Sequence, residues 1–69
     1  MAIMHDARNH LAGLERTLAR YQNELDLLTR YGPPTDPGAR LRARQLRGFI
    51  GAYQTLIARA SARVADLAK

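Results

Sequence analysis

Apolar residues recur at alternating spacings of three and four along two arms of the chain, and the segment 32–38 interrupts the repeat between the arms. A 3.5-residue repeat makes a continuous apolar stripe, here called a seam, only on an α-helix. The pattern therefore predicts two long amphipathic helices, over about residues 3–31 and 37–67. The first seam comprises Met4, Ala7, Leu11, Leu14, Leu18, Tyr21, Leu25 and Leu28, and the second comprises Ala39, Ala43, Leu46, Ile50, Tyr53, Ile57, Ala60, Val64 and Leu67.

The segment between the arms carries signals that end one helix and begin another. Gly32 can adopt the left-handed conformation that closes a helix, and the two prolines after it cannot continue one. Asp36 followed by Pro37 is typical of a helix start, in which the carboxylate caps free backbone N–H groups and proline takes the first helical position. Thr35 is the alternative capping residue. A turn over residues 32–36 would then join the helices into an antiparallel hairpin.

The predicted fold is all-α, a single hairpin over residues 1–69, and the second arm indicates that this hairpin assembles further. Phe49 and Leu56 each stand one position before a seam residue, so they widen the apolar stripe on one side. A four-helix bundle needs that width, because each of its helices faces two neighbours. We therefore predict a partner interface that consists of Phe49, Ile50, Tyr53, Leu56, Ile57, Ala60 and Val64.

The shortness of the chain points in the same direction. A chain of 69 residues has a single core, which at this size seldom supplies more than about 3 to 5 kcal/mol. There is no cysteine, so disulfides and thiolate metal sites are excluded and a homodimer, or a complex with another helical protein, is the remaining way to gain stability. No stretch has the roughly 20 apolar residues of a membrane span, and no secretory signal is recognised at the N-terminus. We expect a cytoplasmic protein.

Charge is concentrated on the second arm. The first arm is neutral, whereas residues 39–69 hold seven basic residues and one acidic residue. In an antiparallel hairpin Glu24 comes alongside Arg42, with Asp26 as a second candidate acid, which predicts an ion pair between the helices. Arg40, Arg44 and Arg47 share a narrow arc and form either a solvated basic face or a patch that binds nucleic-acid phosphates or an acidic protein partner. Nucleic acid is the less favoured target, because aromatic residues are not interleaved with these arginines.

The sequence gives little support for catalysis. His5 and His10 are five residues apart and point to different sides of a helix, so they do not make a metal site. Ser61 is the only serine and has no histidine near it, and there is no glycine-rich phosphate loop. We expect a protein that is not an enzyme and that uses no metal, cofactor or small-molecule substrate.

The helical pattern, together with the segments Arg44-Gln45-Leu46 and Val64-Ala65-Asp66-Leu67-Ala68-Lys69, resembles the small co-chaperones of type III secretion needle subunits, the YscE and PscE type. That resemblance covers the whole chain and implies a cytoplasmic hairpin that joins a larger chaperone to keep a needle subunit unpolymerised. In outline the chain is also similar to Rop, a plasmid regulator that binds RNA as a dimer of hairpins. Small phage-encoded interaction or inhibitor proteins share the architecture as well. The expected function is thus a protein-interaction module that self-associates, docks on a helical partner, or does both.

Overall fold

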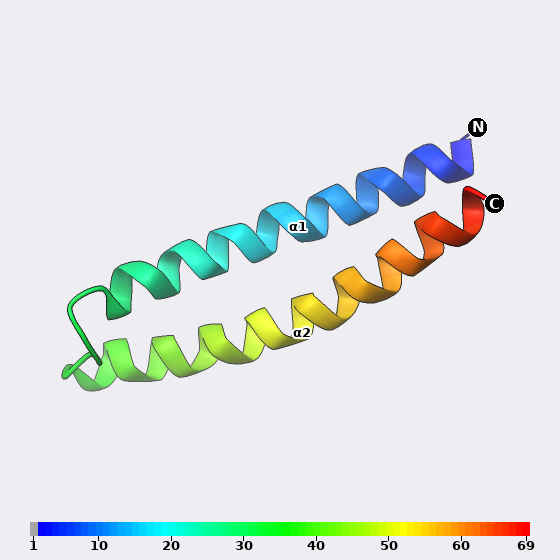
Figure 1. Ribbon diagram of the computed structural model, residues 1–69. Coiled ribbons are helices and arrows are strands. Elements are labelled where there is room, and N and C mark those ends of the chain that lie inside the picture. The colour runs from blue at the N-terminus through cyan, green and yellow to red at the C-terminus, as the bar shows by residue number, and fades with distance from the viewer. Residues whose placement is uncertain (1) are drawn as a thin grey trace.

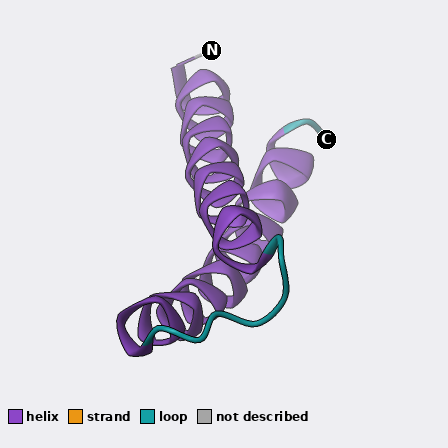
Figure 2. Ribbon diagram, turned by 90° about the vertical axis from the view of Figure 1, so that its left-hand side faces the viewer, coloured by secondary structure: helices purple, strands orange, loops and turns teal. Residues whose placement is uncertain are grey.

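The computed structural model describes residues 2–69 and shows an all-α antiparallel hairpin. Helix α1 spans Ala2–Thr29 and helix α2 spans Pro37–Leu67. The two chain ends lie at the same end of the hairpin, here called the open end, and the turn lies at the other (Figure 1). Viewed from the side, the helices cross at an angle (Figure 2). The predicted fold class is confirmed.

Helix α1 ends two residues before the expected position, because the chain turns once it passes Thr29. The N–H of Gly32 donates to the carbonyl of Thr29 at 3.1 Å, which brings Gly32 back over the last helical turn. Gly32 has a φ of 105°, the left-handed conformation that the sequence predicted for this position. Only glycine adopts that conformation without steric cost, so this residue fixes the point at which the chain reverses.

Helix α2 begins as the sequence predicted, with an aspartate cap and a proline. Asp36 has extended backbone geometry, and its Oδ2 atom accepts a hydrogen bond from the N–H of Ala39 at 2.9 Å. Pro37 follows at the start of the helix, where its missing N–H leaves no hydrogen bond unmade. The alternative cap, Thr35, does not take this role.

Very little of the hairpin is buried. Within residues 3–69 the fully buried side chains are Ala43, at 1% exposure, and Leu46, at 0%. Both lie in the first third of α2, on the turn side of the hairpin. The other seam residues that the structure describes are half-buried, apart from Leu67, which is exposed. The molecule measures 50 × 15 × 14 Å, so it is a thin rod with almost no interior.

Candidate interaction surface

The structure separates the seven predicted interface residues into two groups. Phe49 and Leu56 are exposed at 42% each, because they stand beside the seam rather than within it. The other five are half-buried along the second seam, which is already occupied in part by α1. The first group is therefore available to a partner of the intact hairpin, and the second is composed of Ile50, Tyr53, Ile57, Ala60 and Val64.

Phe49 is held in place by an aromatic cluster. Its ring centroid lies 5.4 Å from that of Tyr21 on α1, and the ring of Tyr53 lies 5.5 Å from that of Tyr21. These separations fall within the range in which tilted aromatic pairs attract one another. Sequence reasoning placed Tyr21 in the first seam but did not find that it supports Phe49. The result is a large apolar side chain that packs against α1 and is still 42% exposed.

Two more exposed apolar residues lie on the same side of the hairpin as Phe49. Leu67 is 41% exposed and stands 18 residues after Phe49, which is five full turns of α2. Ile3 is 63% exposed and stands five full turns before Tyr21 on α1. Ile3 directly precedes the seam residue Met4, as Phe49 precedes Ile50, so the sequence did contain a signal for it. We call the set Ile3, Phe49, Leu56 and Leu67 the apolar face.

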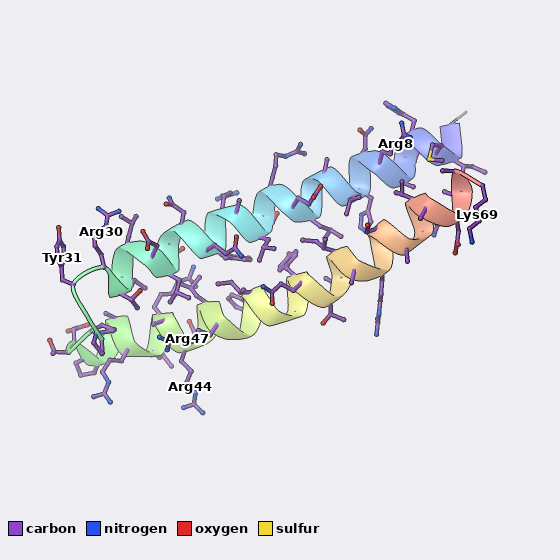
Figure 3. All side chains as sticks on the ribbon, in the orientation of Figure 1. Arg8, Arg30, Tyr31, Arg44, Arg47 and Lys69 are labelled. Carbon is purple, nitrogen blue, oxygen red and sulfur yellow. The ribbon has the colours of Figure 1, made fainter. Side chains whose placement is uncertain are left out.

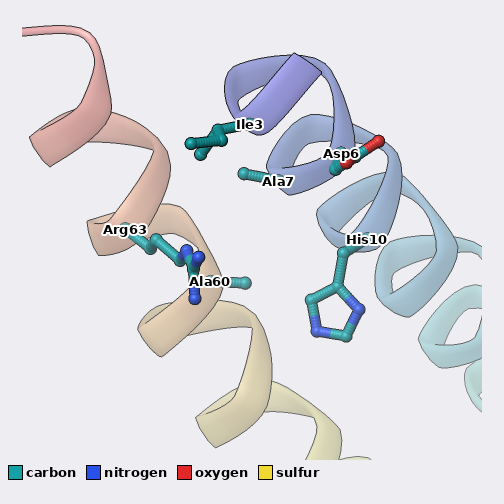
Figure 4. Close-up of a pocket in the computed structure, with 6 residues that line it drawn as sticks. All are labelled: Ile3, Asp6, Ala7, His10, Ala60 and Arg63. Atoms are coloured by element: carbon teal, nitrogen blue, oxygen red, sulfur yellow. The ribbon is translucent and has the colours of Figure 1, made fainter.

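A cavity of about 290 Å³ opens near the open end of the hairpin. The small side chains of Ala7 and Ala60 lie across from each other there and leave space between the helices (Figure 4). The imidazole of His10 and the guanidinium of Arg63 are directed toward this space, whereas the carboxylate of Asp6 is directed away from α2 (Figure 4). No three histidine, aspartate or glutamate side chains in residues 2–69 are grouped so that they could hold a metal ion.

The predicted ion pair between the helices is present near the turn. Nε and Nη2 of Arg42 donate to the two carboxylate oxygens of Glu24 at 2.5 and 3.0 Å. This hydrogen bonding holds the pKa of Glu24 below its ordinary value and raises the pKa of Arg42. Asp26 pairs instead with Arg30 on its own helix, at 3.5 Å. The bidentate pair links α1 to α2 close to the buried part of the core.

The three arginines of the predicted anion patch do not all line the same hollow. Arg40 and Arg47 line a hollow of about 150 Å³ together with Ala43 and the turn residues Pro33 and Pro34. The turn thus forms one wall of this hollow, a role that nothing in its sequence pattern indicated.

The third arginine of the patch, Arg44, is directed away from α1 (Figure 3). None of the three is among the ion pairs in the described part of the chain. Of the three, Arg40 and Arg47 are the two that line a common hollow.

Comparison with known proteins leaves the family open: no family model, curated protein or solved structure gives a significant match to this chain. The resemblance to the secretion co-chaperones stays a prediction. Neither helix in residues 2–69 combines the length and apolar character needed to cross a membrane.

Proposed function

We propose that this chain is a non-enzymatic protein-association module that pairs with a second copy of itself to form a four-helix bundle. The observation that carries the proposal is the small core: among residues 3–69 the hairpin fully buries only Ala43 and Leu46. With two fully buried side chains and a half-buried seam, the single hairpin is only marginally stable against the conformational entropy that two long helices lose on folding. Pairing of two hairpins would bury the apolar side chains that a single hairpin leaves exposed.

The amount of exposed surface fits one partner of about the same size. The chain exposes 5319 Å², whereas a compact monomer of 7.7 kDa exposes about 4,300 Å². The excess is on the order of 1,000 Å² for each chain, and a stable protein interface buries about 800 Å² on each partner. The radius of gyration agrees, since it is 15.5 Å against about 11 Å for a compact domain of this length. Pairing of two rods side by side would bury the excess surface and give a thicker, less elongated particle.

The proposal is tested by light scattering coupled to size exclusion, performed over a series of protein concentrations. We expect a mass of twice the 7.7 kDa of the chain, which falls toward that of one chain on dilution. Phe49→Ala and Leu56→Ala should each shift this transition to higher concentration, because both side chains belong to the apolar face. Leu41→Ala is the matched control, since Leu41 is 57% exposed and lies outside the apolar face. A wild-type chain that stays monomeric and fully helical at micromolar concentration would refute self-association and leave docking on a different helical protein as the alternative.

The hollow beside the turn supports a second candidate function, which is binding of a phosphate of a nucleic acid. Two guanidinium groups line it, and the basic surplus of α2 would attract any polyanion. Arg40→Ala and Arg47→Ala should then weaken binding of labelled RNA or DNA and reduce its dependence on salt. Arg44→Ala is the control and should have the smaller effect, because Arg44 lies outside the hollow. If no RNA or DNA binds at low salt, this candidate is rejected.

A further inference from the structure

The apolar face carries an exposed aromatic side chain, Phe49, and a cavity at the open end of the hairpin. The ring of Phe49 packs against that of Tyr21 and remains 42% exposed. The cavity lies farther along the same face, between Ala7 and Ala60, and measures about 290 Å³. It is partly open to solvent and is lined by both apolar and polar side chains, and its volume exceeds the about 150 Å³ of an enclosed cavity that binds benzene. The cavity at the open end therefore has room for a phenylalanine side chain.

These features follow one line along α2. Leu56 stands seven residues, or about two turns, after Phe49. Ala60 and Arg63 stand four and seven residues after Leu56, and residues at these spacings share a face of a helix. Phe49 and the cavity are thus separated along the axis of α2, and Leu56 stands midway between Phe49 and the cavity residue Arg63.

We infer that the second copy binds antiparallel, so that Phe49 of each chain enters the cavity of the other. This inference rests on the proposed self-association, and it adds the direction and the alignment of the two chains relative to each other. A two-fold axis across the helices at the level of Leu56 exchanges the position of Phe49 with that of Arg63. A parallel dimer would instead bring the two Phe49 side chains to the same level and leave both cavities unfilled. In the antiparallel arrangement, the apolar face of each chain presents Phe49 to the cavity on the apolar face of the other.

Helix α1 agrees with the same axis. Ala7 lines the cavity and Tyr21 supports Phe49, and Leu14 stands seven residues from each of them. The axis therefore passes between α1 helices at Leu14 and between α2 helices at Leu56, so each helix lies against its own counterpart. Every neighbouring pair of helices in the resulting bundle is antiparallel.

Arg63 gives the cavity a specific preference for an aromatic ring. Its guanidinium is directed into the space that the incoming Phe49 would occupy (Figure 4). A guanidinium that lies against an aromatic face is attracted by the ring electrons, and more strongly when water is excluded. The imidazole of His10 borders the same space and offers a second flat surface (Figure 4). The cavity is thus suited to an aromatic side chain more than to an aliphatic one.

The register is tested by disulfide cross-linking, which is simple here because the chain has no cysteine of its own. Leu56→Cys should give a reducible species of twice the chain mass on mild oxidation, since a disulfide requires Cβ atoms about 3.5 to 4.5 Å apart and the axis brings these positions together. Ala58→Cys is the control for the face, because Ala58 is exposed on the opposite side of α2 and should stay unlinked. Phe49→Cys is the control for the orientation: the antiparallel register sets its two copies 14 residues, or about 21 Å, apart along α2, whereas a parallel dimer brings them to one level. Linking of Phe49→Cys, equal linking of Leu56→Cys and Ala58→Cys, or no linking at all, in a protein that light scattering shows to be dimeric would overturn the register and leave self-association standing. A monomeric wild-type chain would overturn both.

The insertion of Phe49 is tested by filling the cavity from within. Ala60→Phe places a ring in the cavity and should raise the dimer Kd by about tenfold or more, because two insertions are lost in each dimer. Ala58→Phe adds the same side chain outside the face and should leave the Kd unchanged. Far-ultraviolet circular dichroism confirms that both variants remain helical. If the two variants dimerise equally well, Phe49 does not occupy the cavity.

Discussion

Replacement of Leu46 by alanine should remove most of the stability of the hairpin. Leu46 is 0% exposed and is the largest fully buried side chain within residues 3–69. Leu→Ala at a buried site costs about 2.7 to 5 kcal/mol, through lost burial and the cavity that remains. The core of so small a domain supplies only about 3 to 5 kcal/mol. We therefore expect Leu46→Ala to lower the midpoint of thermal unfolding by more than about 10 °C, or to prevent folding at ambient temperature.

The matched control is Leu41→Ala, the same chemical change on the same helix. Leu41 is 57% exposed, so its truncation should change the free energy of unfolding by no more than about 0.5 kcal/mol. Both variants are followed by circular dichroism during thermal and urea unfolding. All samples share one protein concentration, because association makes stability depend on concentration. Equal losses in the two variants would show that the contact between α1 and α2 does not hold the hairpin together.

Three further predictions concern the turn, the ion pair and the glycines. Asp36→Ala should cost about 1 kcal/mol in unfolding experiments, whereas Asp36→Asn, which keeps an acceptor oxygen, should cost much less; equal losses would remove the cap as the cause. The pKa of Glu24 is lower in the folded state than in the unfolded state, so its contribution to stability is present above about pH 4.5 and is lost as the pH falls through the folded-state value. Wild type and Glu24→Gln should accordingly differ in stability at neutral pH and converge in acid, and a constant difference would argue against the pair with Arg42. Gly48→Ala should stabilise the chain by up to about 1 kcal/mol, because an added Cβ meets open space in a helix interior. Gly32→Ala should destabilise it, since φ there is positive, and the opposite order in thermal melts would contradict the assigned turn.

The features that the sequence predicted correctly depend on residues close together along the chain. The seams predicted both helices, Gly32 the left-handed residue of the turn, and Asp36 the start of α2. The antiparallel alignment predicted the ion pair of Glu24 with Arg42, whereas the end of α1 was placed two residues too late. The periodicity, the left-handed glycine and the capping bond are local and act within a few residues. The ion pair is not local, but a short turn leaves few ways to align two antiparallel helices.

The features that the sequence did not predict depend on how closely the helices approach. A seam specifies which side of a helix faces its neighbour, but it does not specify the depth to which each side chain is buried. For this reason Leu46 could not be distinguished from Ile50, and the support of Phe49 by Tyr21 could not be found. The separation of Arg44 from the other two arginines likewise depends on where the turn folds back.

The sequence by itself determined two helices, the break between them and the side of each that faces the other. Only the tertiary structure decided what was left uncovered, because two helices can cover no more than one side of each other. Phe49 and Leu56 stay exposed, and the pairing of Ala7 with Ala60 leaves a cavity on the same face. That combination arises from contacts between residues far apart in the sequence, and it is the physical basis for proposing that the chain completes its core with a second copy.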